Sequence, residues 1–119
     1  MNLLLVILAA LLVTLIIPVA VLFELSTLSY KKINKWFFDI AVSIDQFSNV
    51  FCRHILNKAL AKGGAHLFGC EDETVSSVIG KNKESGTLTK TGKFIADTLN
   101  KLQNNHVEAA IEKDENFKK

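Results

Sequence analysis

A run of apolar residues from Leu3 to Phe23 fills the N-terminal part of the chain and contains no charged side chain. As a helix, its 21 residues would span about 31 Å, close to the hydrocarbon thickness of a bilayer, about 30 Å. A helix also satisfies its own backbone hydrogen bonds, which lipid cannot do. Thr14 can bond to a carbonyl one turn earlier, and membrane helices tolerate a proline such as Pro18. The pattern predicts a transmembrane anchor over residues 1–28.

The alternative for this run is a cleaved signal peptide. No Lys or Arg precedes the run, and the run is longer than a signal core of about 7–15 residues. The residues that follow, Glu24 to Thr27, contain no small-x-small cleavage site. We therefore expect an uncleaved anchor.

A second pattern predicts a long amphipathic helix from Ser29 to Lys62, ended by Gly63 and Gly64. Its apolar residues recur every three or four positions, which is the period of a helix. Two interpretations are open for this stripe. It packs against the rest of the domain, which we prefer, or it lies on an anionic membrane surface. The stripe consists of Ile33, Phe37, Ile40, Ile44, Phe47, Phe51, Ile55 and Ala59.

The middle of the chain contains all six glycines, so regular structure there should be short. A short helix is predicted through residues 75–79, with Asp72 or Thr74 as its N-cap and Gly80 as its end. The polar segment Lys81–Thr87 is predicted to be a loop.

Two further helices are predicted in the C-terminal part. One covers Thr89–Gln103, and a shorter one follows Asn105, where Glu108 would complete a capping box. Residues 114–119 form a charged tail. The apolar faces of these helices are Ile95, Leu99 and Leu102 on the first, and Val107, Ala110 and Ile111 on the second. The predicted fold is all-α: one transmembrane helix, a long amphipathic helix and a small helical domain over residues 29–113 with an irregular Gly-rich middle.

Charge is distributed unevenly, although the net charge is only +2. Lys31, Lys32 and Lys35 follow the apolar run closely, and the positive-inside rule then places the C-terminal part in the cytoplasm. Tyr30 and Trp36 suit the headgroup layer, because their rings have one apolar and one polar edge. Basic residues do not cluster with aromatic residues elsewhere, so no nucleic-acid partner is expected.

Cys52, His54, His66 and Cys70 are the residues that suggest a zinc site, since four such ligands can complete a tetrahedral centre. Their spacing argues against it. Cys52 and His54 are two residues apart on a predicted helix and point to different sides, and no Cys-x-x-Cys pair is present. We expect no metal and no cofactor.

An acidic segment, Glu71-Asp72-Glu73, precedes Thr74, Ser76 and Ser77 and suggests a cation site or a catalytic cluster. Adjacent carboxylates point in different directions unless a loop gathers them. The preferred interpretation is helix N-terminal chemistry, in which acids lie near the positive end of a helix dipole. The serines lack the G-x-S-x-G setting of a nucleophile, so no catalytic residue is assigned.

The segment from about 39 to 112 resembles a family of small phage and prophage proteins with no established activity. The resemblance is carried by residues 39–49 (D-I-A-V-S-I-D-Q-F-S-N), 69–77 (G-C-E-D-E-T-V-S-S), 80–81 (G-K) and 106–110 (H-V-E-A-A). Compared with that pattern, residues 51–68 are an insertion, and Val107 stands where members often have Cys.

The resemblance raises one set of polar residues as a network that would tie the acidic loop onto the second helix. The set consists of Asp45, Asn49, Asp72, Glu73, Thr74, Ser76 and His106.

Together, these features predict a non-enzymatic, membrane-anchored accessory protein of phage or prophage origin. It would be a single-pass protein of the bacterial inner membrane, and its cytoplasmic domain would bind a partner protein. The alternative is a membrane-active, holin-like lysis or superinfection-exclusion protein that forms a homo-oligomer through its span. A membrane-tethered hydrolase that uses the acidic loop is a third, weaker alternative.

Overall fold

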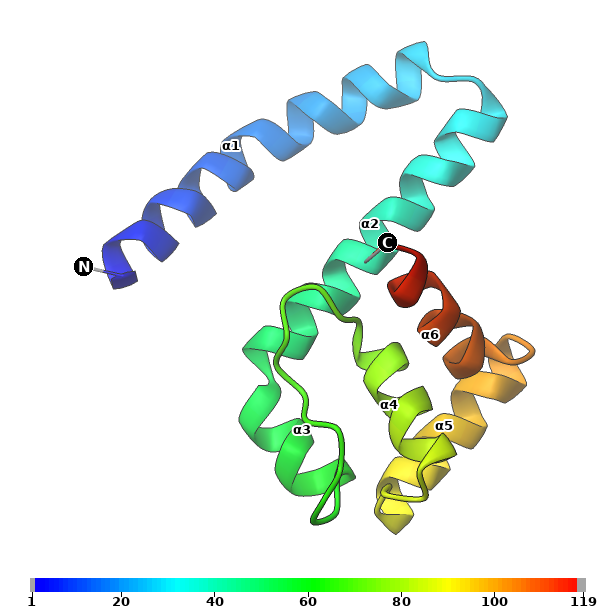
Figure 1. The fold of residues 1–119 in the computed structure, drawn as a ribbon. Helices are drawn as coiled ribbons and strands as arrows, with labels where there is room; N and C mark the ends of the chain where they lie inside the picture. The colour runs from blue at the N-terminus through cyan, green and yellow to red at the C-terminus, as the bar shows by residue number, and fades with distance from the viewer. Residues whose placement is uncertain (1, 118–119) are drawn as a thin grey trace. The chain divides into compact units, whose positions relative to one another are not determined.

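The computed structural model describes residues 2–117, and the side chains of residues 2–111. Helices are the only extended secondary structure over this part of the chain, which has no strand, as predicted (Figure 1). Its compact units divide between Asp39 and Ile40. The helices are α1 (Asn2–Thr27), α2 (Tyr30–Phe51), α3 (Arg53–Leu60), α4 (Val75–Glu84), α5 (Lys90–Leu102) and α6 (His106–Phe117).

Helix α1 contains the predicted apolar run and extends one turn beyond it. None of its described side chains is buried, and it is long and apolar enough to cross a membrane. The Thr14 hydroxyl donates to the Ala10 carbonyl at 2.7 Å, as expected. Pro18 lies inside the helix. At the C-terminal end, the Thr27 hydroxyl donates to the Phe23 carbonyl at 2.8 Å, which partners a polar group in an otherwise apolar segment.

The predicted helix over residues 29–62 is divided at Cys52, whose backbone has φ −96° and ψ 10°. The hydrogen-bond ladder nevertheless continues, because the Cys52 N–H donates to the Ser48 carbonyl at 2.9 Å. The predicted end was also wrong: α3 ends at Leu60 because the next two residues pair with the chain before α5. The Lys62 N–H donates to the Thr87 carbonyl at 2.9 Å beside a bridge between Ala61 and Leu88.

Helix α4 does not end at Gly80, and the predicted loop at Lys81–Thr87 begins as helix. Gly80 is instead a contact position, because a Cβ there would lie 2.4 Å from the Val107 carbonyl oxygen of α6. The helix ends at Glu84, and Gly86 follows with a left-handed φ of 71°. Glycine adopts that conformation without steric cost, so the stop signal lies six residues later than predicted.

Helix α5 begins and ends close to its predicted bounds, with the Thr89 hydroxyl accepting from the Gly92 N–H at 3.1 Å. Leu102, however, is 80% exposed and does not belong to the apolar face.

Helix α6 begins after Asn105, but the capping box was wrong. Asn105 has a left-handed φ of 53°, and the Glu108 carboxylate accepts from Lys83 at 2.7 Å. Residues 118–119 of the predicted tail lie outside the described residues, and α6 extends through residues 114–117.

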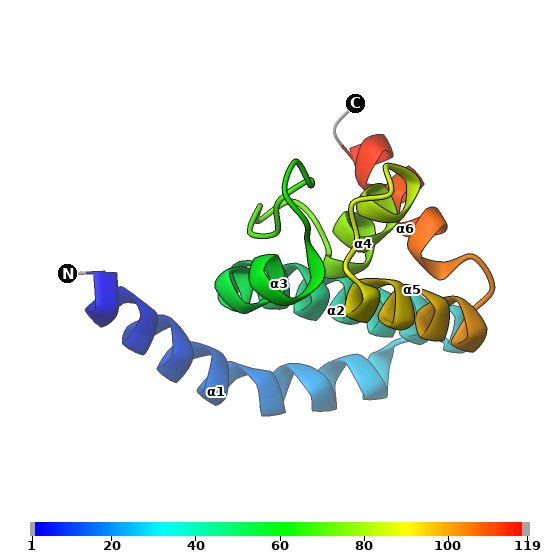
Figure 2. The same cartoon turned by 90° about the horizontal axis from the view of Figure 1, so that it is seen from below.

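The core of the second unit is small and lies where α3, α4, α5 and α6 meet. Helix α4 packs closely against α6, and α5 contacts α3, α4 and α6. Figure 2 shows α4 and α6 together on one side of α3 and α5. The buried apolar side chains are Leu60, Phe68, Val78, Ile79, Leu88, Ala96, Val107 and Ile111.

The apolar stripe of α2 and α3 does not contribute to this core, so the preferred interpretation of that stripe was wrong. Ile44, Phe47, Phe51 and Ile55 are all between 60% and 77% exposed. The side of the helices that packs inward carries Asp45, Asn49 and Asn57 as well as Leu56 and Leu60. The domain is therefore attached to the polar side of α2.

Candidate functional site: the polar junction between α2, the 61–74 loop and α4

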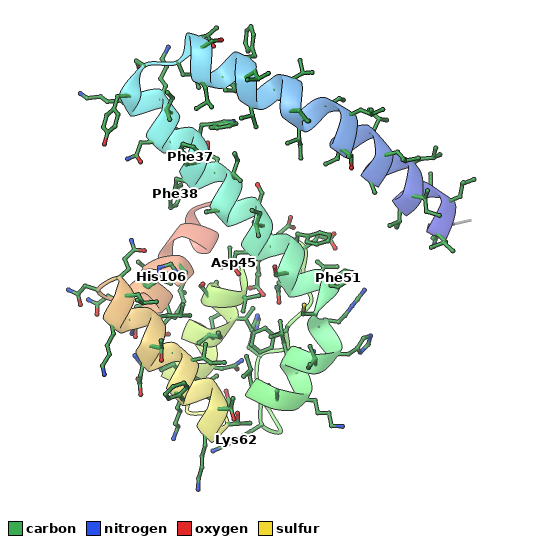
Figure 3. The ribbon with its side chains drawn as sticks, turned by 180° about the vertical axis from the view of Figure 1, so that it is seen from behind. Phe37, Phe38, Asp45, Phe51, Lys62 and His106 are labelled. Carbon is green, nitrogen blue, oxygen red and sulfur yellow. The ribbon has the colours of Figure 1, made fainter. Side chains whose placement is uncertain are left out.

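Asp45 binds the N-terminal end of α4. One carboxylate oxygen accepts from the Val75 N–H at 3.0 Å, and the other accepts from the Ser76 hydroxyl at 2.9 Å. The first N–H groups of a helix have no partner within the helix, and the helix dipole favours a negative charge beside them. Figure 3 shows Asp45 on the side of α2 that faces α4. Asp45 thus supplies from a distant helix the anion that the acidic loop was expected to supply locally.

Thr74 is the N-cap of α4, which settles the choice between Asp72 and Thr74. Its hydroxyl accepts from the Ser77 N–H at 3.0 Å, and its backbone is extended, as an N-cap requires. Asp72 is exposed, and its backbone carbonyl, rather than its carboxylate, accepts from Gln46 at 3.4 Å.

Asn49 fastens the loop before α4 onto α2. The side chain is fully buried, and its amide nitrogen donates to the carbonyls of Cys70 and Glu73 at 3.0 and 2.9 Å. Its amide oxygen accepts from the Gly69 N–H at 3.0 Å. Each of these contacts satisfies a backbone group that has no helix or sheet partner.

Asn57 and Asn82 repeat this arrangement farther back along the loop. Asn57 exchanges two hydrogen bonds with the backbone of Phe68, at 2.7 and 3.0 Å. Asn82 does the same with the backbone of His66, at 2.7 and 2.8 Å. An asparagine amide can replace a peptide group because it offers both a donor and an acceptor. Three asparagines on three helices therefore fix the irregular loop.

Glu73 has a buried carboxylate at the centre of an ion network, although its neighbours Glu71 and Asp72 are exposed. Its carboxylate contacts the Lys81 ammonium group and lies 2.8 Å from His66 Nε2. Burial alone would raise the pKa of Glu73. The hydrogen bonds and charges of Lys81 and His66 outweigh burial and lower the pKa from 4.5 to about 2. Glu73 is therefore ionised at neutral pH and contributes to holding the loop against α4.

Ser76 and His106 connect α4 to α6. The Ser76 hydroxyl lies 3.2 Å from His106 Nε2, and His106 Nδ1 lies 2.9 Å from the Gln103 side-chain oxygen. Because Asp45 contacts the serine, the order is Asp–Ser–His. In a catalytic triad the carboxylate contacts the imidazole, which can then remove the serine proton. Ser76 is also buried, so the contacts amount to an interlock between helices rather than an activated nucleophile.

The structure connects Asp45, Ser76 and His106 directly. Asn49 binds the backbone carbonyl of Glu73, and Thr74 caps the same end of α4 through the Ser77 N–H. The carboxylate of Asp72 takes no part in these contacts.

The predicted interface residues Tyr30, Lys31, Lys32, Lys35 and Trp36 all lie in the first unit. Tyr30 is 85% exposed, and Lys35 pairs with Asp39 at 2.6 Å. Their placement against lipid stays a prediction.

Sequence reasoning missed Asn57, His66, Lys81 and Asn82. One signal was available for the asparagines and none for Lys81. Asparagine is unfavourable inside a helix, so a helical asparagine that persists often makes a side-chain-to-backbone bond. Lys81 follows Glu73 by eight residues across a cap, and that separation predicts no contact until the helix bounds are known.

The four cysteine and histidine residues of the zinc hypothesis are not gathered. Cys52 is half-buried, Cys70 and His54 are exposed, and His66 is held by Glu73. Among the side chains of residues 2–111, no group of three His, Cys, Asp or Glu is placed to hold a metal ion.

Comparison of the chain with protein-family models, with curated proteins and with solved structures gave no match.

Proposed function

We propose that the chain is a single-pass membrane protein whose helical domain acts at the membrane as a non-enzymatic accessory or interaction module. Helix α1 carries the proposal. It has 26 residues, none of them buried in the chain's own fold, and no charged residue from Leu3 to Phe23. A surface of this kind is unfavourable in water and favourable in a bilayer.

An interaction role is supported by the chemistry of the polar junction. Its charged and amide groups are engaged in attaching the loop, α2, α4 and α6 to one another, and they fix the shape of the domain. A bacterial inner-membrane location, a protein partner and a phage origin belong to the same proposal. They rest on flanking charge and on the motif resemblance.

Carbonate extraction of the intact chain tests the anchor. A Leu12→Arg/Ile16→Arg variant should leave the membrane pellet, because an arginine at the centre of a span costs about 2.5–3.5 kcal/mol. A matched control replaces two exposed apolar residues outside α1, Phe94→Arg/Leu102→Arg, and should stay in the pellet.

The proposal fails if the wild-type chain is found in the supernatant, or if the mature protein lacks residues 1–28. A dye-leakage assay addresses the holin-like alternative. Expression of the wild-type chain should leave cells impermeable to the dye, whereas leakage that disappears in the α1 double variant would favour the pore-forming function.

A further inference from the structure

The part of α2 in the second unit has the reverse of the usual surface-helix arrangement, and α3 continues its apolar outer side although α3 also packs Leu56 and Leu60 inward. A helix at the surface of a soluble domain buries its apolar stripe and exposes its polar side. Here the polar side carries the junction, and the apolar side faces away from the domain. We define the outer face as Ile44, Phe47, Phe51 and Ile55, which are 60%, 65%, 77% and 67% exposed. Figure 3 shows Phe51 on the side of α2 away from α4.

Two side chains of the outer face contact each other. The rings of Phe47 and Phe51 stack with centroids 5.6 Å apart. The helix behind them is held by Asp45 and Asn49, which contact residues of the 69–76 segment. A surface that docks on this face therefore does not have to displace any part of the second unit.

The charges of these helices favour an anionic surface. Residues 31–62 carry six basic and two acidic side chains. Both acids are engaged: Asp39 pairs with Lys35 at 2.6 Å, and Asp45 binds the end of α4. Long basic side chains can reach lipid phosphates while the apolar face enters the acyl region. The net positive charge is complementary to acidic headgroups.

The short link between α1 and α2 also favours a membrane surface as the binding partner. Helix α2 begins at Tyr30, three residues after α1 ends at Thr27. Such a short link reaches at most about 10 Å, so α2 begins at the membrane boundary if α1 spans the bilayer. Anchoring by α1 also raises the effective concentration of lipid around α2, so that even a weak affinity of this helix for lipid leads to binding.

We infer that the outer face of α2 and α3 lies in the interface of the same membrane, with apolar residues among the acyl chains and basic residues near acidic headgroups. The inference rests on the proposed anchor and adds a second attachment, which orients the domain. A second copy of the chain is less suited to this face, because two such faces would bring basic helices together without acidic partners.

Quenching of tryptophan fluorescence by brominated lipids tests the inference on the full chain. Trp36→Phe removes the single native tryptophan. In that background, Phe47→Trp places a probe on the outer face, and Phe94→Trp places a matched probe at another phenylalanine that is 72% exposed. Both proteins are reconstituted into vesicles of phosphatidylcholine with about one quarter phosphatidylglycerol, with bromine on the acyl chains.

We expect the tryptophan at position 47 to lose at least half of its emission and to shift to shorter wavelength, because its ring enters the acyl region. The tryptophan at position 94 should be quenched severalfold less. Equal, weak quenching at both positions overturns the inference. So does a blue-shifted but unquenched tryptophan at position 47, which would show a protein surface covering the face.

Flotation of the vesicles distinguishes failure of the outer face to enter the membrane from failure of the α1 anchor. If the protein does not float with the vesicles, the proposed span is wrong. If the protein floats and position 47 is not quenched, only the docking of the outer face is wrong. Circular dichroism of both variants confirms that the helices are intact.

Discussion

At the scale of single residues, the ionisation of Glu73 depends on two opposing effects: burial disfavours the charged carboxylate, and the neighbouring Lys81 and His66 favour it. Glu73 is only 2% exposed, which disfavours its ionised form. Hydrogen bonds and charge interactions with Lys81 and His66 nevertheless lower its pKa from 4.5 to about 2. The fall in pKa corresponds to about 3 kcal/mol as an upper bound.

Glu73→Gln should destabilise the second unit at neutral pH by about 2 kcal/mol, because Lys81 then keeps a half-buried charge without its partner. The pKa of Glu73 is lower in the folded chain than in the unfolded chain. Its stabilisation is therefore complete above pH 4.5 and is lost as the pH falls toward about 2. Urea unfolding in mild detergent, followed by circular dichroism across this range, measures the effect.

Glu84→Gln is the matched control for that experiment, since Glu84 is exposed at the end of the same helix. It should leave the acid dependence of unfolding unchanged. An acid profile of Glu73→Gln that coincides with that of the wild type would show that Lys81 and His66 do not stabilise the carboxylate.

Alanine substitutions of two hydroxyl residues near the start of α4, Thr74 and Ser77, should change the free energy of unfolding in opposite directions. Thr74→Ala removes the N-cap bond to the Ser77 N–H and should cost about 1 kcal/mol. The Ser77 hydroxyl is buried and has no hydrogen-bond partner among the described residues. Ser77→Ala should therefore be neutral or stabilising by up to about 1 kcal/mol. The same urea titrations compare them, and an equal loss in both variants would contradict the assignment of the cap.

At the scale of elements, the sequence predicted helices reliably where local chemistry decided their ends. Thr74, one of the two predicted candidates, is the N-cap of α4, and the period of three or four residues correctly placed the helix now seen as α2 and α3. Tertiary contacts decided the rest. The position of Gly80 as a contact for α6, rather than a helix end, depends on how α4 and α6 pack.

The candidate site shows the same division. The motif resemblance grouped Asp45, Asn49, Asp72, Glu73, Thr74, Ser76 and His106. Of these, the structure bonds Asp45, Ser76 and His106 to one another and attaches Asn49 to the Glu73 backbone, whereas the Asp72 carboxylate takes no part. Periodicity alone misdirected the interpretation of α2, because it identifies an apolar side without saying what covers it. The inward side is instead chosen by polar contacts that span 20–31 residues of chain, from Asn49 to Gly69 and from Asp45 to Ser76.

Gly80→Ala should destabilise the second unit by about 2 kcal/mol, although alanine is the better helix former by about 1 kcal/mol. The new methyl group would lie 2.4 Å from the Val107 carbonyl oxygen and 2.9 Å from the Ile111 side chain, so α6 would have to move. Gly63→Ala is the control, because a Cβ at Gly63 has no atom within 4 Å, and it should be nearly neutral. Thermal unfolding in detergent distinguishes the two, and a Gly80→Ala protein as stable as wild type would refute the close packing.

At the scale of the whole molecule, an apolar helix is joined to a small domain whose apolar outer face points away from its own core. Each feature is costly for a freely soluble protein, since both expose large apolar side chains to water. Both become favourable if one bilayer receives them. In that case the lipid bilayer alone would cover both α1 and the outer face, and neither would need a separate protein partner.

The orientation of that molecule can be measured through Cys70, which is exposed in the second unit, whereas Cys52 is half-buried. Lys31, Lys32 and Lys35 flank α1 and resist translocation, so the domain should face the cytoplasm. In a Cys52→Ser background, a membrane-impermeant maleimide should label Cys70 in inverted vesicles and not in intact spheroplasts, and Cys70→Ser should abolish the signal. Labelling in intact spheroplasts would reverse the orientation. It would still leave the start of α2 beside the membrane that α1 is proposed to cross, because the link between the two helices is equally short on either side.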